Sequence, residues 1–125
     1  MRDDKERLLD IREQIEFIEE DVLIGRNAFD SDRHIRDSMI LRIATIGEAC
    51  RAMSKEFRER YPDIPWTEII GMRAKLMHDY FDVDEEEVWR TAQRDIPALR
   101  HQIERLIAEN LDHGDLLYDE RGLPK

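Results

Sequence analysis

Apolar residues recur at alternating steps of three and four along the first part of the chain, the spacing that keeps side chains on one face of a helix. The residues that follow it are Leu8, Ile11, Ile15, Ile18 and Val22. Gly25 should end this first helix, because glycine favours helix C-termini. Residues 25–32 are polar and predict a loop, with Ser31 or Asp32 as the N-cap of the next helix.

The same spacing then continues over a longer span and predicts a second helix from about residue 32 to about residue 60. Its apolar residues are Ile35, Met39, Ile43, Ile46, Cys50, Met53 and Phe57. A continuous helix of this length would extend about 40 Å. Pro62 and Pro65 should end it, because two prolines within four residues are incompatible with a helix interior.

Two further apolar stripes predict a third and a fourth helix. The third begins near Pro65, a residue suited to a first helical turn, and extends to Tyr80. Its apolar residues are Trp66, Ile69, Ile70, Leu76, Met77 and Tyr80. The fourth begins at Asp84, which with Glu87 forms a variant of the capping box, and Pro97 should kink it without ending it. Its apolar residues are Val88, Ala92, Ile96, Leu99, Ile103 and Leu106.

Four apolar stripes joined by short connections predict an all-α fold, an antiparallel up-and-down bundle of four main helices. The composition agrees, because 41% hydrophobic and 40% charged residues with only 5 Gly and 4 Pro favour long amphipathic helices. The expected domain spans residues 1–110. Residues 111–125 lose the helical period and should form a loosely ordered tail. Long helices with full stripes leave apolar surface to cover, so we expect a homodimer.

The net charge of −10 excludes a protein that coats nucleic acid non-specifically, because that requires a basic surface. Contact with RNA would need a local positive patch. The single cysteine, Cys50, excludes an internal disulfide and falls on the apolar stripe of the second helix, so we expect a buried structural thiol. No apolar run approaches the length of a membrane span, and the N-terminus lacks a signal peptide. We therefore expect a soluble cytoplasmic protein.

The run from Gly71 to Tyr80 carries the most informative chemistry, because it sets charged groups on an otherwise apolar segment. Arg73 lies on the third stripe, and His78 lies five positions later, about 140° around an ideal helix. An imidazole can deprotonate a 2′-hydroxyl, and a guanidinium can stabilise a pentavalent phosphate. Lys75 adds to a local positive patch. The simpler interpretation is a snorkelling arginine and a histidine at a helix end.

Several short motifs in their expected order resemble the HepT-like (DUF86) toxins of the HEPN superfamily. They lie within residues 5–110 and centre on Arg-x4-His-x-Tyr at residues 73–80, preceded by Trp-x-x-Ile-Ile-Gly-Met at 66–72. Ile-Gly-Glu-Ala at 46–49 and Tyr-Pro-x-Ile-Pro-Trp at 61–66 match further stretches of that family, as does His-x-Tyr-Phe-x-Val-Asp at 78–84.

The resemblance implies a helical bundle that dimerises so that two Arg-x4-His motifs face one cleft. It implies a metal-independent endoribonuclease that needs no cofactor, with Arg73 and His78 as the catalytic pair. A symmetric interface could then complete the site from two chains. It also implies a toxin of a toxin–antitoxin system, whose nucleotidyltransferase antitoxin adenylylates Tyr80. Such a group would place negative charge beside Arg73 and exclude RNA phosphate. As an ordinary residue, Tyr80 would close the apolar stripe.

One position departs from the family pattern, since Ala74 stands where a polar residue, most often Asn, usually follows the motif arginine. A methyl group cannot hydrogen-bond to a substrate or orient a histidine. The alternative hypothesis is therefore a weak or inactive helical module that binds a nucleotide or a partner protein. A third is a purely structural helical dimer.

Metal chemistry has weaker support in the sequence. His78-Asp79 is compatible with a metal-dependent phosphohydrolase, for which His34 and His101 are the further candidate ligands. A di-iron bundle requires Glu-x-x-His motifs, and none of the four histidines has a glutamate three residues before it. We predict no metal site.

Overall fold

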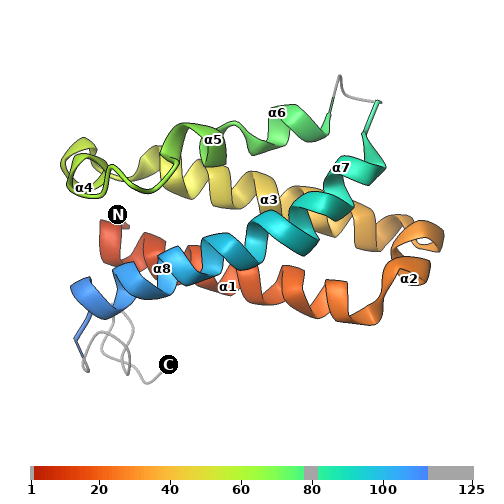
Figure 1. The fold of residues 1–125 in the computed structure, drawn as a ribbon, viewed down its shortest axis with the longest axis horizontal. Coiled ribbons are helices and arrows are strands. Elements are labelled where there is room, and N and C mark those ends of the chain that lie inside the picture. Colours follow the sequence, from red (N-terminus) through yellow and green to blue (C-terminus); the bar gives the residue numbers. More distant parts are fainter. Residues whose placement is uncertain (1, 78–81, 113–125) are drawn as a thin grey trace.

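Helices account for most of the residues that the computed structural model describes, which are residues 2–77 and 82–112 (Figure 1). The all-α prediction is confirmed, because the described residues form no β-strand. Their β-type pairing is limited to one isolated bridge between Met77 and Val83. The helices are α1 (Asp4–Ile24), α2 (Arg26–Ser31), α3 (Arg33–Ala52), α4 (Lys55–Arg60), α5 (Trp66–Ile70), α6 (Met72–Leu76), α7 (Glu85–Arg90), the π-helical segment η1 (Thr91–Asp95) and α8 (Ile96–Asn110).

The core forms where α1 packs against both α3 and α8, and α1 runs antiparallel to each of them (Figure 1). The fully buried side chains of these helices include Leu8, Ile11, Ile15, Ile18, Met39, Ile43, Ile46, Ile96, Ile103 and Leu106. Burying a side chain of this size stabilises the fold by about 1.5–3 kcal/mol. The apolar stripes of the sequence therefore identify the core. The four-helix bundle, its dimer and the domain limits at residues 1–110 stay predictions.

The connection after α1 was predicted as a loop, and that prediction is wrong, because residues 26–31 form α2. Gly25 ends α1 as predicted and adopts φ +109°, a conformation that side chains rarely tolerate. Its turn lets the chain re-enter a helix at once. Asp32 is the N-cap of α3, since its carboxylate accepts a hydrogen bond of 2.9 Å from the His34 amide.

The second helix is not continuous as predicted, because it divides into α3 and α4 at Met53 and Ser54. Ser54 is extended, and its hydroxyl accepts a hydrogen bond from the Phe57 amide, capping α4. Asp4, fifty residues earlier, accepts hydrogen bonds from the Ser54 amide at 2.9 Å and from its hydroxyl at 2.6 Å. This long-range cap breaks a helix that the apolar spacing alone predicts as unbroken.

The third and fourth helices are also subdivided. The third breaks at Gly71 into α5 and α6, and it ends at Leu76 rather than reaching Tyr80. The fourth begins with the predicted Asp84 cap, whose carboxylate accepts from the Glu87 amide at 3.1 Å. It continues through Pro97 as predicted, but the π-helical turn η1 precedes that proline.

Gly47 sets how closely α5 approaches α3. A β-carbon at this position would lie 3.2 Å from the carbonyl oxygens of both Ile69 and Ile70. Such contacts are tighter than ordinary packing, so the missing side chain lets the α5 backbone rest on α3. Two motifs that are separate in the sequence, at residues 46–49 and 66–72, therefore contact each other.

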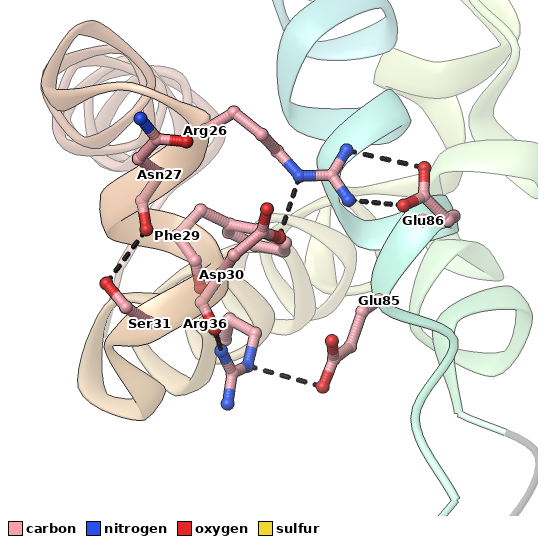
Figure 2. A network of polar contacts seen from close by, with 8 residues as sticks. All are labelled: Arg26, Asn27, Phe29, Asp30, Ser31, Arg36, Glu85 and Glu86. Carbon is pink, nitrogen blue, oxygen red and sulfur yellow. Dashed lines mark hydrogen bonds and ion pairs between the residues drawn. The ribbon is translucent and has the colours of Figure 1, made fainter.

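A network of hydrogen bonds and ion pairs joins α2 to α7 (Figure 2). Arg26 donates to Asp30 at 2.8 Å on its own helix and to both carboxylate oxygens of Glu86 on α7. Its guanidinium also lies 5.6 Å from the ring centroids of Phe29 and Trp89, which pack together at 5.1 Å. The hydrogen bond from Arg26 lowers the pKa of Glu86. Arg26 thus holds the first turn of α7.

A second arginine extends this network from α3. Arg36 donates hydrogen bonds of 2.8 Å to the carbonyl oxygens of Phe29 and Asp30, which are at the end of α2 (Figure 2). It also forms an ion pair of 3.5 Å with Glu85 on α7. Three helices are therefore linked at the start of α7.

Cys50 is fully buried, and burial raises the pKa of its thiol to about 12. The expectation of a buried thiol is confirmed. Within residues 2–77 and 82–112, no helix is both long and apolar enough to span a membrane. The cytoplasmic location stays a prediction.

Replacing Gly47 with valine should displace α5 from α3. We expect Gly47→Val to lower the free energy of unfolding by about 1–3 kcal/mol, because overpacking forces backbone shifts. The control is Gly71→Ala, whose β-carbon would have its nearest contact at an ordinary 3.4 Å, the Thr67 carbonyl oxygen. Thermal denaturation of both variants measures the difference. An unchanged melting temperature for Gly47→Val would contradict the close approach.

Replacing Arg26 with methionine should remove a pH-dependent contribution to stability. A carboxylate whose pKa is lowered in the folded protein stabilises it above its unfolded pKa, and this stabilisation disappears as the pH falls through the folded value. The melting temperature of Arg26→Met should therefore lie below that of the native protein at pH 7, and the gap should narrow at about pH 3, below the usual glutamate pKa. Glu86→Gln should lower the melting temperature at pH 7 in the same way, with the same narrowing of the gap at low pH. A gap that stays constant with pH would argue against this pair.

Candidate active site

Arg73 lies on α6 with its side chain exposed. Its neighbours Met72 and Leu76 are buried and anchor α6 to the core. The prediction that Arg73 lies on the packed stripe is therefore wrong, because the break at Gly71 separates α6 from α5 and changes which face packs. Arg73 makes no ion pair with another described residue, so its guanidinium is available to an anion.

Lys75 shares α6 with Arg73 but faces another way. Residues two apart on a helix are separated by about 200°. Lys75 lines a groove between helices, and Arg73 does not. The structure therefore places these two cations on different sides of one short helix. Ala74, between them, is also exposed, and its methyl group offers no hydrogen bond.

His78 and Tyr80 lie outside the described residues. The angle of about 140° between Arg73 and His78 assumed one helix through both. That assumption fails, because α6 ends at Leu76 and Met77 is extended, with φ −129° and ψ 116°. The separation of the two side chains thus depends on the connection after α6 and not on helical geometry.

The two ends of the connection between α6 and α7 contact each other. Met77 and Val83 form an antiparallel bridge, and the Asp84 amide donates a hydrogen bond of 2.8 Å to the Leu76 carbonyl oxygen. Because Asp84 also caps α7, the chain returns to a fixed position. In the sequence, His78 and Tyr80 lie between these two fixed ends and follow α6, the helix that carries Arg73.

Both helices that flank the connection are held by the core and by the surface network. Leu76 and Val88, on α6 and α7, have no exposed surface. Arg26 and Arg36 bind the first turn of α7 through Glu86 and Glu85 (Figure 2). A site on such supports can hold a substrate phosphate in a fixed place.

A groove of about 370 Å³ separates α5 and α6 from η1 and α8. Its lining residues are Pro65, Glu68, Ile69, Met72, Lys75, Thr91, Asp95, Ala98, Leu99 and Gln102. Thr91 is only 3% exposed, whereas Glu68, Lys75 and Asp95 are exposed and make no ion pair with other residues in the described ranges. Sequence reasoning missed Glu68, Thr91 and Asp95, because their meeting depends on how distant helices pack.

Of the candidate metal ligands that the sequence offered, His34 and His101 lie on different helices, and His78 and Asp79 lie outside the described residues. His34 is exposed on α3, and His101 is exposed on α8. Over residues 2–77 and 82–112, no group of three or more His, Cys, Asp or Glu side chains could hold a metal ion.

Comparison with known proteins supplies the family. The model of the Ribonuclease HepT-like family matches residues 11–106. A Thermococcus cleftensis protein named "Probable ribonuclease HepT" is 40% identical over 106 residues, which cover 84% of this chain and 96% of that protein. A Methanocaldococcus jannaschii protein, MJ1380, named as a candidate RNase, is 36% identical over 107 residues, covering 82% of this chain and 95% of that protein.

A third relative, a candidate RNase of Caldanaerobacter subterraneus, is 37% identical over 98 residues, covering 78% of this chain and 88% of that protein. No solved structure matches significantly. The family match includes α6, the bridge at Met77 and Val83, and both walls of the groove. The chain belongs to the Ribonuclease HepT-like family.

Proposed function

We propose that the chain is a metal-independent endoribonuclease in which Arg73 and His78 act on the RNA backbone. The observation that carries the proposal is the closed junction between α6 and α7. Arg73, which is exposed and makes no ion pair with a described residue, lies one turn before the bridge between Met77 and Val83. The names of the relatives support ribonuclease chemistry.

The reaction needs one base and one stabilising cation. The imidazole of His78 takes the proton of a 2′-hydroxyl, and the 2′-oxygen attacks the adjacent phosphorus. The guanidinium of Arg73 binds the equatorial oxygens of the pentavalent intermediate, where negative charge develops. The bond to the 5′-oxygen then breaks, and that oxygen takes a proton from water or from a second imidazole. The products are a 2′,3′-cyclic phosphate and a 5′-hydroxyl.

A second copy of the chain would complete the site. In this proposal four main helices form the bundle, and two bundles pair so that both Arg73 and His78 residues face one cleft. Large side chains left on the surface favour a further contact. Leu23, Ile24 and Leu41 are 86%, 61% and 67% exposed in the single chain.

The biological setting we propose is a toxin–antitoxin system. A nucleotidyltransferase antitoxin would adenylylate Tyr80, two residues after His78. The added phosphate would compete with RNA for Arg73, which makes no ion pair within the described residues. Activity would return once the group is removed.

Ala74 favours a second candidate function. Its exposed methyl group lies beside Arg73, at the position where a polar side chain could bind a phosphate oxygen or orient the imidazole. A chain with impaired catalysis could still bind RNA, a nucleotide or a partner protein through the same surface. This candidate keeps Arg73 as a binding residue and removes the chemical step.

Cleavage of single-stranded RNA in excess EDTA tests the proposal. We expect slow cleavage by the native protein and faster cleavage by Ala74→Asn. Arg73→Ala or His78→Ala in the Ala74→Asn background should lower the rate by about 10²–10⁴-fold, the usual loss when a general base or a stabilising donor is removed.

The matched control is Arg51→Ala, which removes an exposed arginine whose ion pair within the described residues is with Glu48 on its own helix. It should leave the rate within twofold of its parent. RNA that stays intact with both the native protein and Ala74→Asn would reject the ribonuclease and leave the binding module. Cleavage that survives His78→Ala would reject the proposed base.

A further inference from the structure

We propose that the groove between α5–α6 and η1–α8 binds an unpaired guanine base of the RNA strand whose neighbouring phosphate lies at Arg73. The inference rests on the proposed function, because it names the part of the substrate that the same surface would recognise. It assigns roles to Glu68, Lys75 and Asp95, which sequence motifs do not connect.

The dimensions and walls of the groove suit a flat base. Its volume of about 370 Å³ accommodates a nucleobase with part of its ribose. Ile69 and Met72 on one side and Leu99 on the other are almost completely buried, so they present fixed apolar surfaces. Proteins recognise single-stranded RNA by splaying bases out of the strand, and in this groove aliphatic side chains and Met72 take the place of the aromatic rings on which bases usually stack.

The polar groups of the groove select among the bases. Glu68 and Asp95 carry carboxylates that make no ion pair with other described residues, so they accept hydrogen bonds from a ligand. Guanine presents two adjacent donors on its Watson–Crick edge, N1–H and the N2 amino group, which match the two oxygens of one carboxylate. Adenine and cytosine place an acceptor next to their single donor group, and uracil places its N3–H between two carbonyl oxygens, so none of them offers two adjacent donors to one carboxylate.

Lys75 connects this groove to the phosphate at Arg73. It lines the groove and belongs to the same five-residue helix as Arg73, on a different side. A strand that crosses α6 would bring one phosphate to Arg73 and the neighbouring phosphate to Lys75. The base between them would then lie over the groove, so that base binding and phosphate binding occur on one substrate.

The π-helical segment η1 shapes the far wall. Thr91 and Asp95, its first and last residues, both line the groove. Residues four apart lie on one face of a helix, so both side chains line the same wall, and π-helical turns recur at functional sites.

Binding of three short RNAs tests the inference. The strands U-U-G-U-U, U-U-A-U-U and U-U-C-U-U are titrated into the His78→Ala protein, which prevents cleavage, and fluorescence anisotropy gives each dissociation constant. We expect the guanine strand to bind about tenfold more tightly than the other two, the scale of one bidentate base contact. The double variant Glu68→Gln with Asp95→Asn should bring that ratio close to one.

Two further variants control for charge. Glu59→Gln with Glu109→Gln removes the same charge from exposed positions outside the groove and should keep the preference for guanine. Lys75→Met should weaken all three strands alike and reduce the salt dependence of binding, as loss of a phosphate contact does. Thermal melting confirms that each variant is folded.

A native preference ratio of one, or a ratio that survives the double groove variant, overturns the inference, as does a failure to bind any strand. So does a double variant that changes only the oligomeric state, since the groove would then be covered by a second copy. Failure of the proposed ribonuclease function would give a different result. No variant would cleave RNA, but the native groove would still prefer guanine and the double variant would still lose that preference.

Discussion

The closure of the chain between α6 and α7 is the constraint on which the site depends. The hydrogen bond of 2.8 Å from the Asp84 amide to the Leu76 carbonyl oxygen, with the bridge at Met77 and Val83, fixes where the motif connection starts and where it returns. A backbone bond of this kind contributes only about 1 kcal/mol by itself. It persists because both ends belong to helices that the core holds in place, with Leu76 and Val88 fully buried. The packing of distant helices thus sets the geometry of a short segment.

The charged residues around α6 and α7 have different functions in this account. A chain with net charge −10 repels RNA at long range, so any binding depends on local cations that are not neutralised. Most arginines in the described ranges are paired, and those of the α2–α7 network support structure (Figure 2). Arg73 and Lys75 make no ion pair with other described residues, and they lie on different sides of the short helix α6. The carboxylates of Glu68 and Asp95 line the same groove as Lys75, and in our proposal they repel phosphate and accept hydrogen bonds from a base.

The sequence was informative where a residue acts with its neighbours along the chain. The apolar spacing identified the core faces, and local chemistry identified the Gly25 end and the caps at Asp32 and Asp84. Prediction from the sequence failed where contacts between residues distant in the chain determine the local structure. The break at Ser54 depends on Asp4, fifty positions away, and an apolar pattern carries no sign of it. The exposure of Arg73 and the grouping of Glu68 with Asp95 follow from how α6 and η1 pack, which no single stripe records.

The central claim is that RNA meets this protein at the α6–α7 junction. Backbone amide NMR signals, followed during titration with a short single-stranded RNA, test it most directly. The account predicts that the largest shifts fall on residues 72–77, on Val83 and Asp84, and on η1, while the outer faces of α1 and α4 stay unchanged. Shifts confined to those outer faces, with none at the junction, would contradict it.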